Sequence, residues 1–142
     1  MKKIDLTEKE KDIELVFIFG SQKEKAIQYL RGGNIVKQKE PDLDLGILLS
    51  REAYQNIDDK FTYYGQLYDI FSNLLPDFKL DLVLLNEVSI FIQVEAVKGY
   101  KLYQRNQNVF DEYIEGLNKK YNDLNFVRKM YYREMQEAIL HE

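Results

Sequence analysis

The amino-acid sequence predicts an α/β domain, a small sheet with helices packed on it, followed by a long C-terminal helix. Three observations support this. Short apolar runs at residues 15–19, 43–49 and 79–85 are typical of buried strands. A stretch of about 25 residues with helical periodicity separates the second run from the third, as in a crossover between parallel strands. Residues 109–140 carry apolar side chains along one stripe, which indicates a long helix.

The elements of the first half are marked by their boundary residues. Strand 15–19 ends in Gly20 and Ser21, a pair typical of a tight turn. One or two helical turns are expected over 22–30. We expect residues 32–40, which begin with two glycines, to form a flexible loop. Pro41 precedes the second strand, a position at which a strand tolerates proline.

The second half continues the alternation of helix and strand. Residues 52–75 predict one long amphipathic helix closed by Pro76. The third strand, 79–85, is followed by a short helix over 88–97, ended by Gly99, and by a short edge strand over 101–103. For the helix over 109–140, a break near Gly116 is one alternative. The expected organisation is a domain at 1–105 and a helical extension at 106–142, which packs on the domain or on a partner.

Composition excludes several classes of site. The chain is 45% hydrophobic and 31% charged, as expected of a globular protein. It has no cysteine and its single histidine is His141, so disulfides, thiolate zinc sites and histidine-based triads are excluded. The net charge of −4 argues against a general nucleic-acid binder. We expect a cytoplasmic protein, because no apolar run has the length of a membrane span.

Three aspartates are placed where their burial would be costly. Asp42 and Asp44 are separated by one residue at the start of an extended segment, so their carboxylates point to the same side. Asp81 lies inside the third apolar strand. Mg²⁺ prefers oxygen ligands and would offset these charges. Spacing alone leaves a second interpretation equally open, in which Asp42 belongs to a turn, Asp44 is an edge-strand charge and Asp81 is a surface residue paired with lysine.

The end of the first strand favours the metal interpretation. Gly20 allows backbone amides to approach a phosphate closely, and the Ser21 hydroxyl can donate a hydrogen bond to a phosphate oxygen. Lys23 and Lys25 add positive charge directly afterwards. Gly-Ser after one strand, Asp-x-Asp on the next and a single aspartate on the third form a rarer combination than any one of them.

This combination resembles the nucleotidyltransferase superfamily of the DNA polymerase β type, and specifically its minimal members, the MNT antitoxins of HEPN RNase toxins. The matching segments are 17–21, 42–45, 80–85 and 95–103. The resemblance implies a mixed sheet with packed helices that binds ATP and Mg²⁺, two ions being expected. Gly20 and Ser21 would then hold the β- and γ-phosphates, with Lys23 and Lys25 beside them. Asp42, Asp44 and Asp81 would bind metal, and Asp81 would orient or deprotonate the attacking hydroxyl.

The family's reaction would transfer AMP from ATP to a tyrosine of the cognate HEPN toxin. Two alternatives remain. In one, the chain silences the toxin by binding alone, since the segment between Ser21 and Asp42 is about twice the family's usual length and residues 22–26 lack the further glycine that family members carry there. In the other, the acceptor is a small molecule. The tyrosines and arginines of the C-terminal helix suit a protein interface, to a toxin or to a second copy of the chain, or packing on the chain's own sheet.

Overall fold

The structure is a computed structural model that describes residues 11–20, 23–32 and 42–140. Along the chain, the described residues form four strands and five helices. They are β1 (Ile13–Phe19), α1 (Lys23–Leu30), β2 (Asp42–Leu49), α2 (Arg51–Gln55), α3 (Lys60–Leu74), β3 (Lys79–Leu84), α4 (Ile90–Val97), β4 (Tyr100–Gln104) and α5 (Gln107–Leu140). The predicted flexible loop lies largely outside the described residues, which resume at Asp42.

The four strands form one mixed sheet in the order β3-β2-β1-β4. β1 pairs antiparallel with both β2 and β4, and β2 pairs parallel with β3. The parallel pair confirms the predicted crossover, because α2 and α3 connect two strands that run in the same direction. The predicted edge strand is also confirmed, with β4 at one edge of the sheet and β3 at the other.

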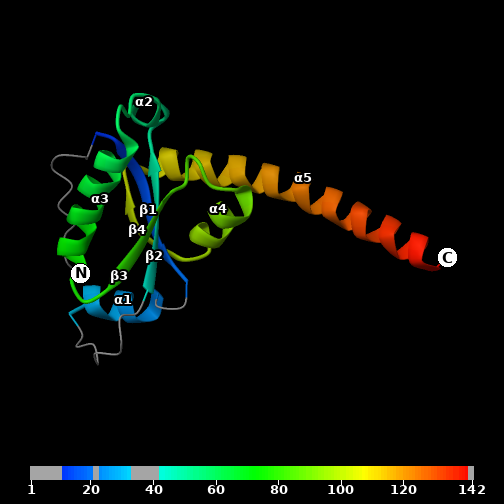
Figure 1. Ribbon diagram of the computed structural model, residues 1–142, viewed down its shortest axis with the longest axis horizontal. Coiled ribbons are helices and arrows are strands. Elements are labelled where there is room, and N and C mark those ends of the chain that lie inside the picture. Colours follow the sequence, from blue (N-terminus) through cyan, green and yellow to red (C-terminus); the bar gives the residue numbers. More distant parts are fainter. Residues whose placement is uncertain (1–10, 21–22, 33–41, 141–142) are drawn as a thin grey trace.

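Helices cover both faces of the sheet, so β1 and most of β2 are buried between two apolar layers (Figure 1). On one face, Leu43, Leu45 and Ile47 of β2 join the core formed with α1 and α3. On the other face, Phe17 packs with Ala96 of α4 and with the first turns of α5. Side chains alternate between the faces along a strand, so the even-numbered residues of β2 lie on the α4 face.

The predicted helix over 52–75 is wrong as a single element, because the structure has two helices there. Ser50 caps α2 by accepting a hydrogen bond from the Ala53 N–H, and α2 ends at Gln55, with Asn56 as its C-cap. Asp59 then caps α3, accepting bonds from the Phe61 N–H at 3.1 Å and the Thr62 hydroxyl at 2.6 Å. Side chains that bond the backbone locally compete with a continuous helix, which explains the break.

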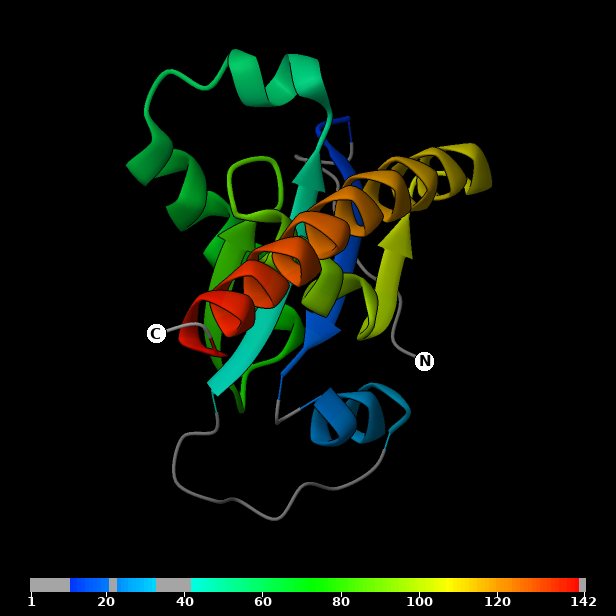
Figure 2. The ribbon, with the colours of Figure 1, turned by 90° about the vertical axis from the view of Figure 1, so that its right-hand side faces the viewer.

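α5 is continuous through Gly116, so the alternative of a break there is not observed. Its first turns pack on the sheet through Phe110 and Tyr113, and Leu117 is buried. Farther along, α5 projects away from the sheet on the α4 face (Figure 1; Figure 2). None of the helices in the described ranges is long and apolar enough to cross a membrane.

Candidate active site

Two of the three aspartates meet across the parallel strands. Asp44 of β2 is the register partner of Asp81 of β3, and Asp42 is the partner of Lys79 two pairs earlier. Register partners in a parallel pair share a face, which is the α4 face because Leu43 and Leu45 point into the opposite core. The aspartates therefore lie at the beginning of β2 and β3, on neighbouring strands. Because β2 lies inside the sheet, the interpretation of Asp44 as an edge-strand charge is wrong.

Gly20 completes this arrangement from β1. Phe19 is the antiparallel partner of Asp44, and Gly20 follows it with φ of 85°, in the left-handed region that favours glycine. A Cβ atom at Gly20 would collide with Oδ2 of Asp44. The residue at the end of β1 therefore lets the backbone approach the carboxylate directly, a contact that no other residue type would permit without a shift.

The electrostatics of the site are those of crowded carboxylates. Burial raises the pKa of Asp44, and the charge and hydrogen bond of Asp81 raise it further, with a smaller contribution from the charge of Asp42. Asp42 and Asp81 themselves are exposed. Negative charges held this close favour a proton or a cation between them.

The donor atoms of this group fit Mg²⁺, which takes a small number of carboxylate oxygens and completes its shell with water and substrate. Within the described ranges, however, no three acidic, histidine or cysteine side chains converge closely enough to hold a metal ion. Asp44 and Asp81 lie directly opposite each other on β2 and β3. Asp42 lies nearby on the same face, but it does not form a three-carboxylate cluster with them.

The phosphate-binding residues predicted beside the aspartates are placed only in part. Ser21 lies outside the described residues. Lys23 begins α1, and its N–H donates to the carbonyl of Gly20 at 3.3 Å, which fixes the helix directly after the turn. The Lys23 ammonium lies 3.9 Å from a carboxylate oxygen of Glu24. Lys25 lies in the first turn of the same helix.

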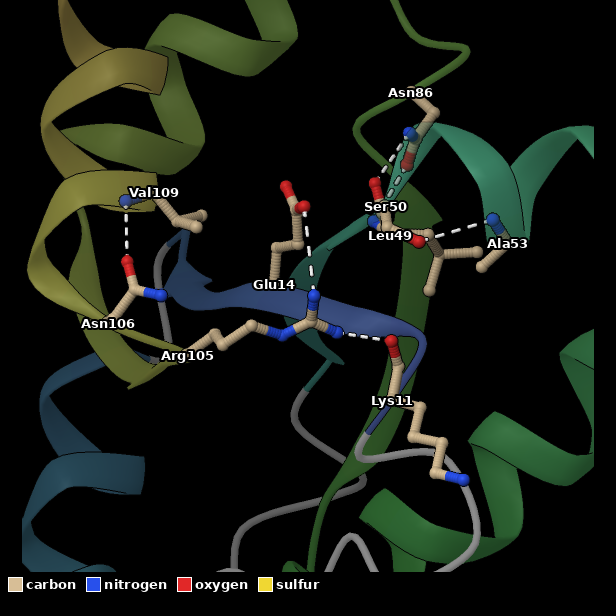
Figure 3. A network of polar contacts seen from close by, with 9 residues as sticks. All are labelled: Lys11, Glu14, Leu49, Ser50, Ala53, Asn86, Arg105, Asn106 and Val109. Carbon is tan, nitrogen blue, oxygen red and sulfur yellow. Dashed lines mark hydrogen bonds and ion pairs between the residues drawn. The ribbon is translucent and has the colours of Figure 1, made fainter.

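A clamp at the far end of β2 escaped prediction (Figure 3). The side chain of Asn86 accepts from the Leu49 N–H and donates to the Leu49 carbonyl, both at 2.9 Å. The amide thus imitates a strand partner and continues the β2–β3 pairing beyond the end of β3. Its only signal in the sequence is an asparagine directly after an apolar strand, which also fits an ordinary turn.

A cavity of about 620 Å³ also lies at that far end, with Asp12, Ser50, Asp59 and Tyr63 in its wall. The aspartates of β2 and β3 do not line it. This cavity therefore does not mark the carboxylate site. That site is identified by the register of β2 with β3 and by the carboxylates that the register brings together.

Comparison with known proteins supplies the family. The family of polymerase β nucleotidyltransferases matches residues 2–108. The chain belongs to this family. The nucleotidyltransferase fold thus predicted from the strand motifs is confirmed, with a mixed sheet and packed helices.

Solved structures share the fold of this nucleotidyltransferase at low sequence identity. A chain of a toxin–antitoxin crystal structure with AMP-PNP is 18% identical, with a TM-score of 0.57 and 88% of this chain and 87% of that chain covered. A chain in the structure of the tri-AMPylated Shewanella oneidensis HEPN toxin in complex with MNT antitoxin is also 18% identical, with a TM-score of 0.56. The match covers 88% of this chain and 84% of that chain. No curated protein matches the nucleotidyltransferase sequence significantly.

Proposed function

We propose that this nucleotidyltransferase is an MNT-type antitoxin that transfers AMP from ATP to a tyrosine of a cognate HEPN RNase toxin. The observation that carries the proposal is the Asp44–Asp81 pair, with Gly20 packed against it, in a polymerase β nucleotidyltransferase fold. The toxin–antitoxin structures with the same fold, one of them holding an AMPylated toxin, support the choice of acceptor.

The proposed reaction is a displacement at the α-phosphorus of ATP. The tyrosine oxygen forms a new bond to that phosphorus, and the bond from the phosphorus to the bridging oxygen breaks, releasing pyrophosphate. Asp81, on the exposed edge strand, takes the tyrosine proton and orients the hydroxyl. Gly20 and Ser21 hold the β- and γ-phosphates, and Lys23 and Lys25 supply charge beside them. Such transfers depend mainly on positioning and on neutralising charge.

The carboxylates of Asp42, Asp44 and Asp81 are the proposed ligands of two Mg²⁺ ions. When bound, Mg²⁺ supplies positive charge that offsets the triphosphate and the developing charge on pyrophosphate. Burial and, after it, the neighbouring carboxylates raise the pKa of Asp44, and the crowding of charges supports this assignment because a divalent cation relieves the repulsion. The proposal also places the protein in the cytoplasm and divides it into a catalytic domain at 1–105 and an extension at 106–142 that contacts the toxin.

A second function, silencing the toxin by binding alone, is favoured by one feature. α5 runs from Gln107 to Leu140 and projects beyond the sheet, where it offers a surface to a partner that does not involve the aspartates (Figure 1). In this alternative the nucleotidyltransferase fold is kept as a scaffold.

The test is intact-mass spectrometry of the HEPN toxin after incubation with this chain, ATP and Mg²⁺. A mass gain of one or more AMP groups is expected with the wild-type chain and is expected to be absent with the Asp42→Ala, Asp44→Ala double variant. Asp69→Ala, which removes an exposed carboxylate of α3, is the matched control and keeps the activity. No mass gain with the wild-type chain, in a sample where the two proteins form a complex, would leave binding alone as the function.

A further inference from the structure

One lysine occupies a place in the site that the proposed roles leave unused. Lys79 is the first residue of β3 and the register partner of Asp42, two residues before Asp81. Residues two apart on a strand share a face, so Lys79 lies on the α4 face together with the three aspartates. Neighbouring strands are about 4.8 Å apart, so the stem of Lys79 starts next to Asp42.

Lys79 forms no ion pair with these carboxylates in the part of the chain that the structure describes. The ion pairs among the described residues involve other lysines and Arg105, and none of them includes Lys79. Its side chain is exposed. The interpretation of Asp81 as a surface residue paired with lysine is therefore not what the described part of the chain shows. An ammonium group in register with the aspartates and directed to solvent is available for an anion that arrives from outside.

A positive charge at this flank of the carboxylates would offset part of the charge of a bound phosphate. Gly20 lies on the β1 side of Asp44, whereas Lys79 lies on the β3 side, across β2. A nucleotide over the aspartates brings phosphates with several negative charges next to three carboxylates. A lysine ammonium is a compact charge on a flexible four-carbon stem, suited to a phosphate oxygen at this range.

We propose that Lys79 binds a phosphate group of the nucleotide, from the side of the site opposite Gly20. This inference rests on the proposed function and adds a contact to it. A competing explanation comes from the position of β3 at the sheet edge, where exposed lysines commonly prevent association of strands between molecules. Edge protection alone would act on oligomeric state and leave nucleotide affinity unchanged, which separates the two explanations.

The experiment is calorimetric titration of the full-length chain with ATP in the presence of Mg²⁺, at two salt concentrations. Lys79→Gln is expected to weaken binding about tenfold, the usual effect of losing one charge-assisted hydrogen bond. It is also expected to reduce the dependence of affinity on salt. Lys79→Arg keeps the charge and is expected to restore most of the affinity. Lys119→Gln, which removes an exposed lysine of α5, is the matched control and is expected to bind as the wild type does.

Parallel titrations with AMP and ADP assign the phosphate. An effect of Lys79→Gln that persists with AMP places the contact at the α-phosphate, and one seen only with ADP and ATP places it farther along. Equal ATP affinity for wild type and Lys79→Gln overturns the inference while leaving the proposed function intact. If Lys79→Gln weakens ATP binding as expected but the wild-type chain transfers no AMP to the toxin, the inference about Lys79 holds and the proposed function is overturned. A wild-type chain that does not bind ATP overturns both.

Discussion

At the scale of single residues, the site depends on one backbone position as much as on its carboxylates. Gly20 combines a φ of 85° with a contact to Asp44 that excludes a Cβ atom. These two constraints are independent, since the first concerns the backbone of Gly20 and the second the side chain of a neighbouring strand. A larger residue at position 20 would therefore meet both a strained backbone and a displaced carboxylate.

Gly20→Ala is expected to lower the free energy of unfolding by roughly 2 kcal/mol, the sum of left-handed strain and a displaced carboxylate. Urea denaturation monitored by circular dichroism measures this change. Gly116→Ala is the control, because a Cβ at Gly116 in α5 meets nothing within 4 Å. Alanine there should be neutral or stabilising by up to about 1 kcal/mol, as is usual in a helix. Equal effects of the two substitutions would contradict the account of Gly20.

The carboxylate pair predicts a dependence of stability on pH. A carboxyl group whose pKa is raised by folding holds its proton more tightly in the folded chain than in the unfolded one. Asp44 therefore costs stability above its raised pKa, and this cost is removed as the pH falls through that pKa toward the ordinary value of 3.8. Asp81→Asn removes the neighbouring charge, so it is expected to lower the pKa of Asp44.

In EDTA at neutral pH, Asp81→Asn is therefore expected to raise the free energy of unfolding by up to about 1 kcal/mol. It is also expected to flatten the rise in stability that accompanies a fall in pH from neutral toward 3.8. Thermal melts across this range measure both effects. Asp69→Asn, on the exposed side of α3, is expected to change neither. Destabilisation by Asp81→Asn at neutral pH would show that the pair is held together by attraction and not crowded by repulsion.

These residues could be singled out as candidates from the sequence because their signals are local. Gly-Ser after an apolar run and aspartates within apolar strands can each be identified from a few neighbouring positions. The pairing of Asp44 with Asp81 depends on strand register across a crossover, which the sequence does not state. The availability of Lys79 follows from the same register, so it became visible only once β2 and β3 were aligned.

At the scale of elements, side chains that bond to backbone decide where strands and helices end. The apolar spacing over residues 52–75 continues across the turn between α2 and α3, so periodicity alone predicts one helix. Asp59 nevertheless starts a new helix there, because its side chain caps the N-terminus of α3. Asn86 acts in the same way on a strand, since it bonds both backbone groups of Leu49 across 37 residues of sequence.

Asn86→Ala is expected to destabilise the fold by roughly 1–3 kcal/mol, because it leaves a buried N–H and a buried carbonyl unpaired. Leu49, which carries both groups, is 1% exposed. Asn86→Asp keeps the acceptor for the Leu49 N–H and loses the donor, so an intermediate loss is expected. Urea denaturation gives both values. A neutral Asn86→Ala would mean that water replaces the amide at this position.

At the scale of the whole molecule, the sheet and α5 are attached through a limited contact. The described packing of α5 on the body involves its first turns, from Val109 to the ring contact between Tyr121 and Phe91. A chain that ends at Asn122 keeps all of this described packing, so its melting temperature is expected to stay within a few degrees of that of the full chain. The same truncation is expected to weaken binding to the toxin if α5 forms the interface.

Differential scanning calorimetry checks the first expectation, and titration with the toxin checks the second. Truncation before Val109 is the contrasting variant, because it removes Phe110 and Tyr113 from the core on the α4 face. That variant is expected to be strongly destabilised. A large loss of stability on ending the chain at Asn122 would show that the later turns of α5 also pack on the domain.

The projecting helix has a consequence for how the protein moves through solution. α5 contains 34 residues, so at 1.5 Å per residue it is ~51 Å long. A compact chain of this size has a radius of gyration of only about 14 Å. Such a shape experiences more friction than a sphere of equal mass. A monomer is therefore expected to elute from a sizing column earlier than a compact protein of the same mass, 17.0 kDa. Elution volume alone would therefore overstate the mass, and light scattering is the measurement that gives the subunit number correctly.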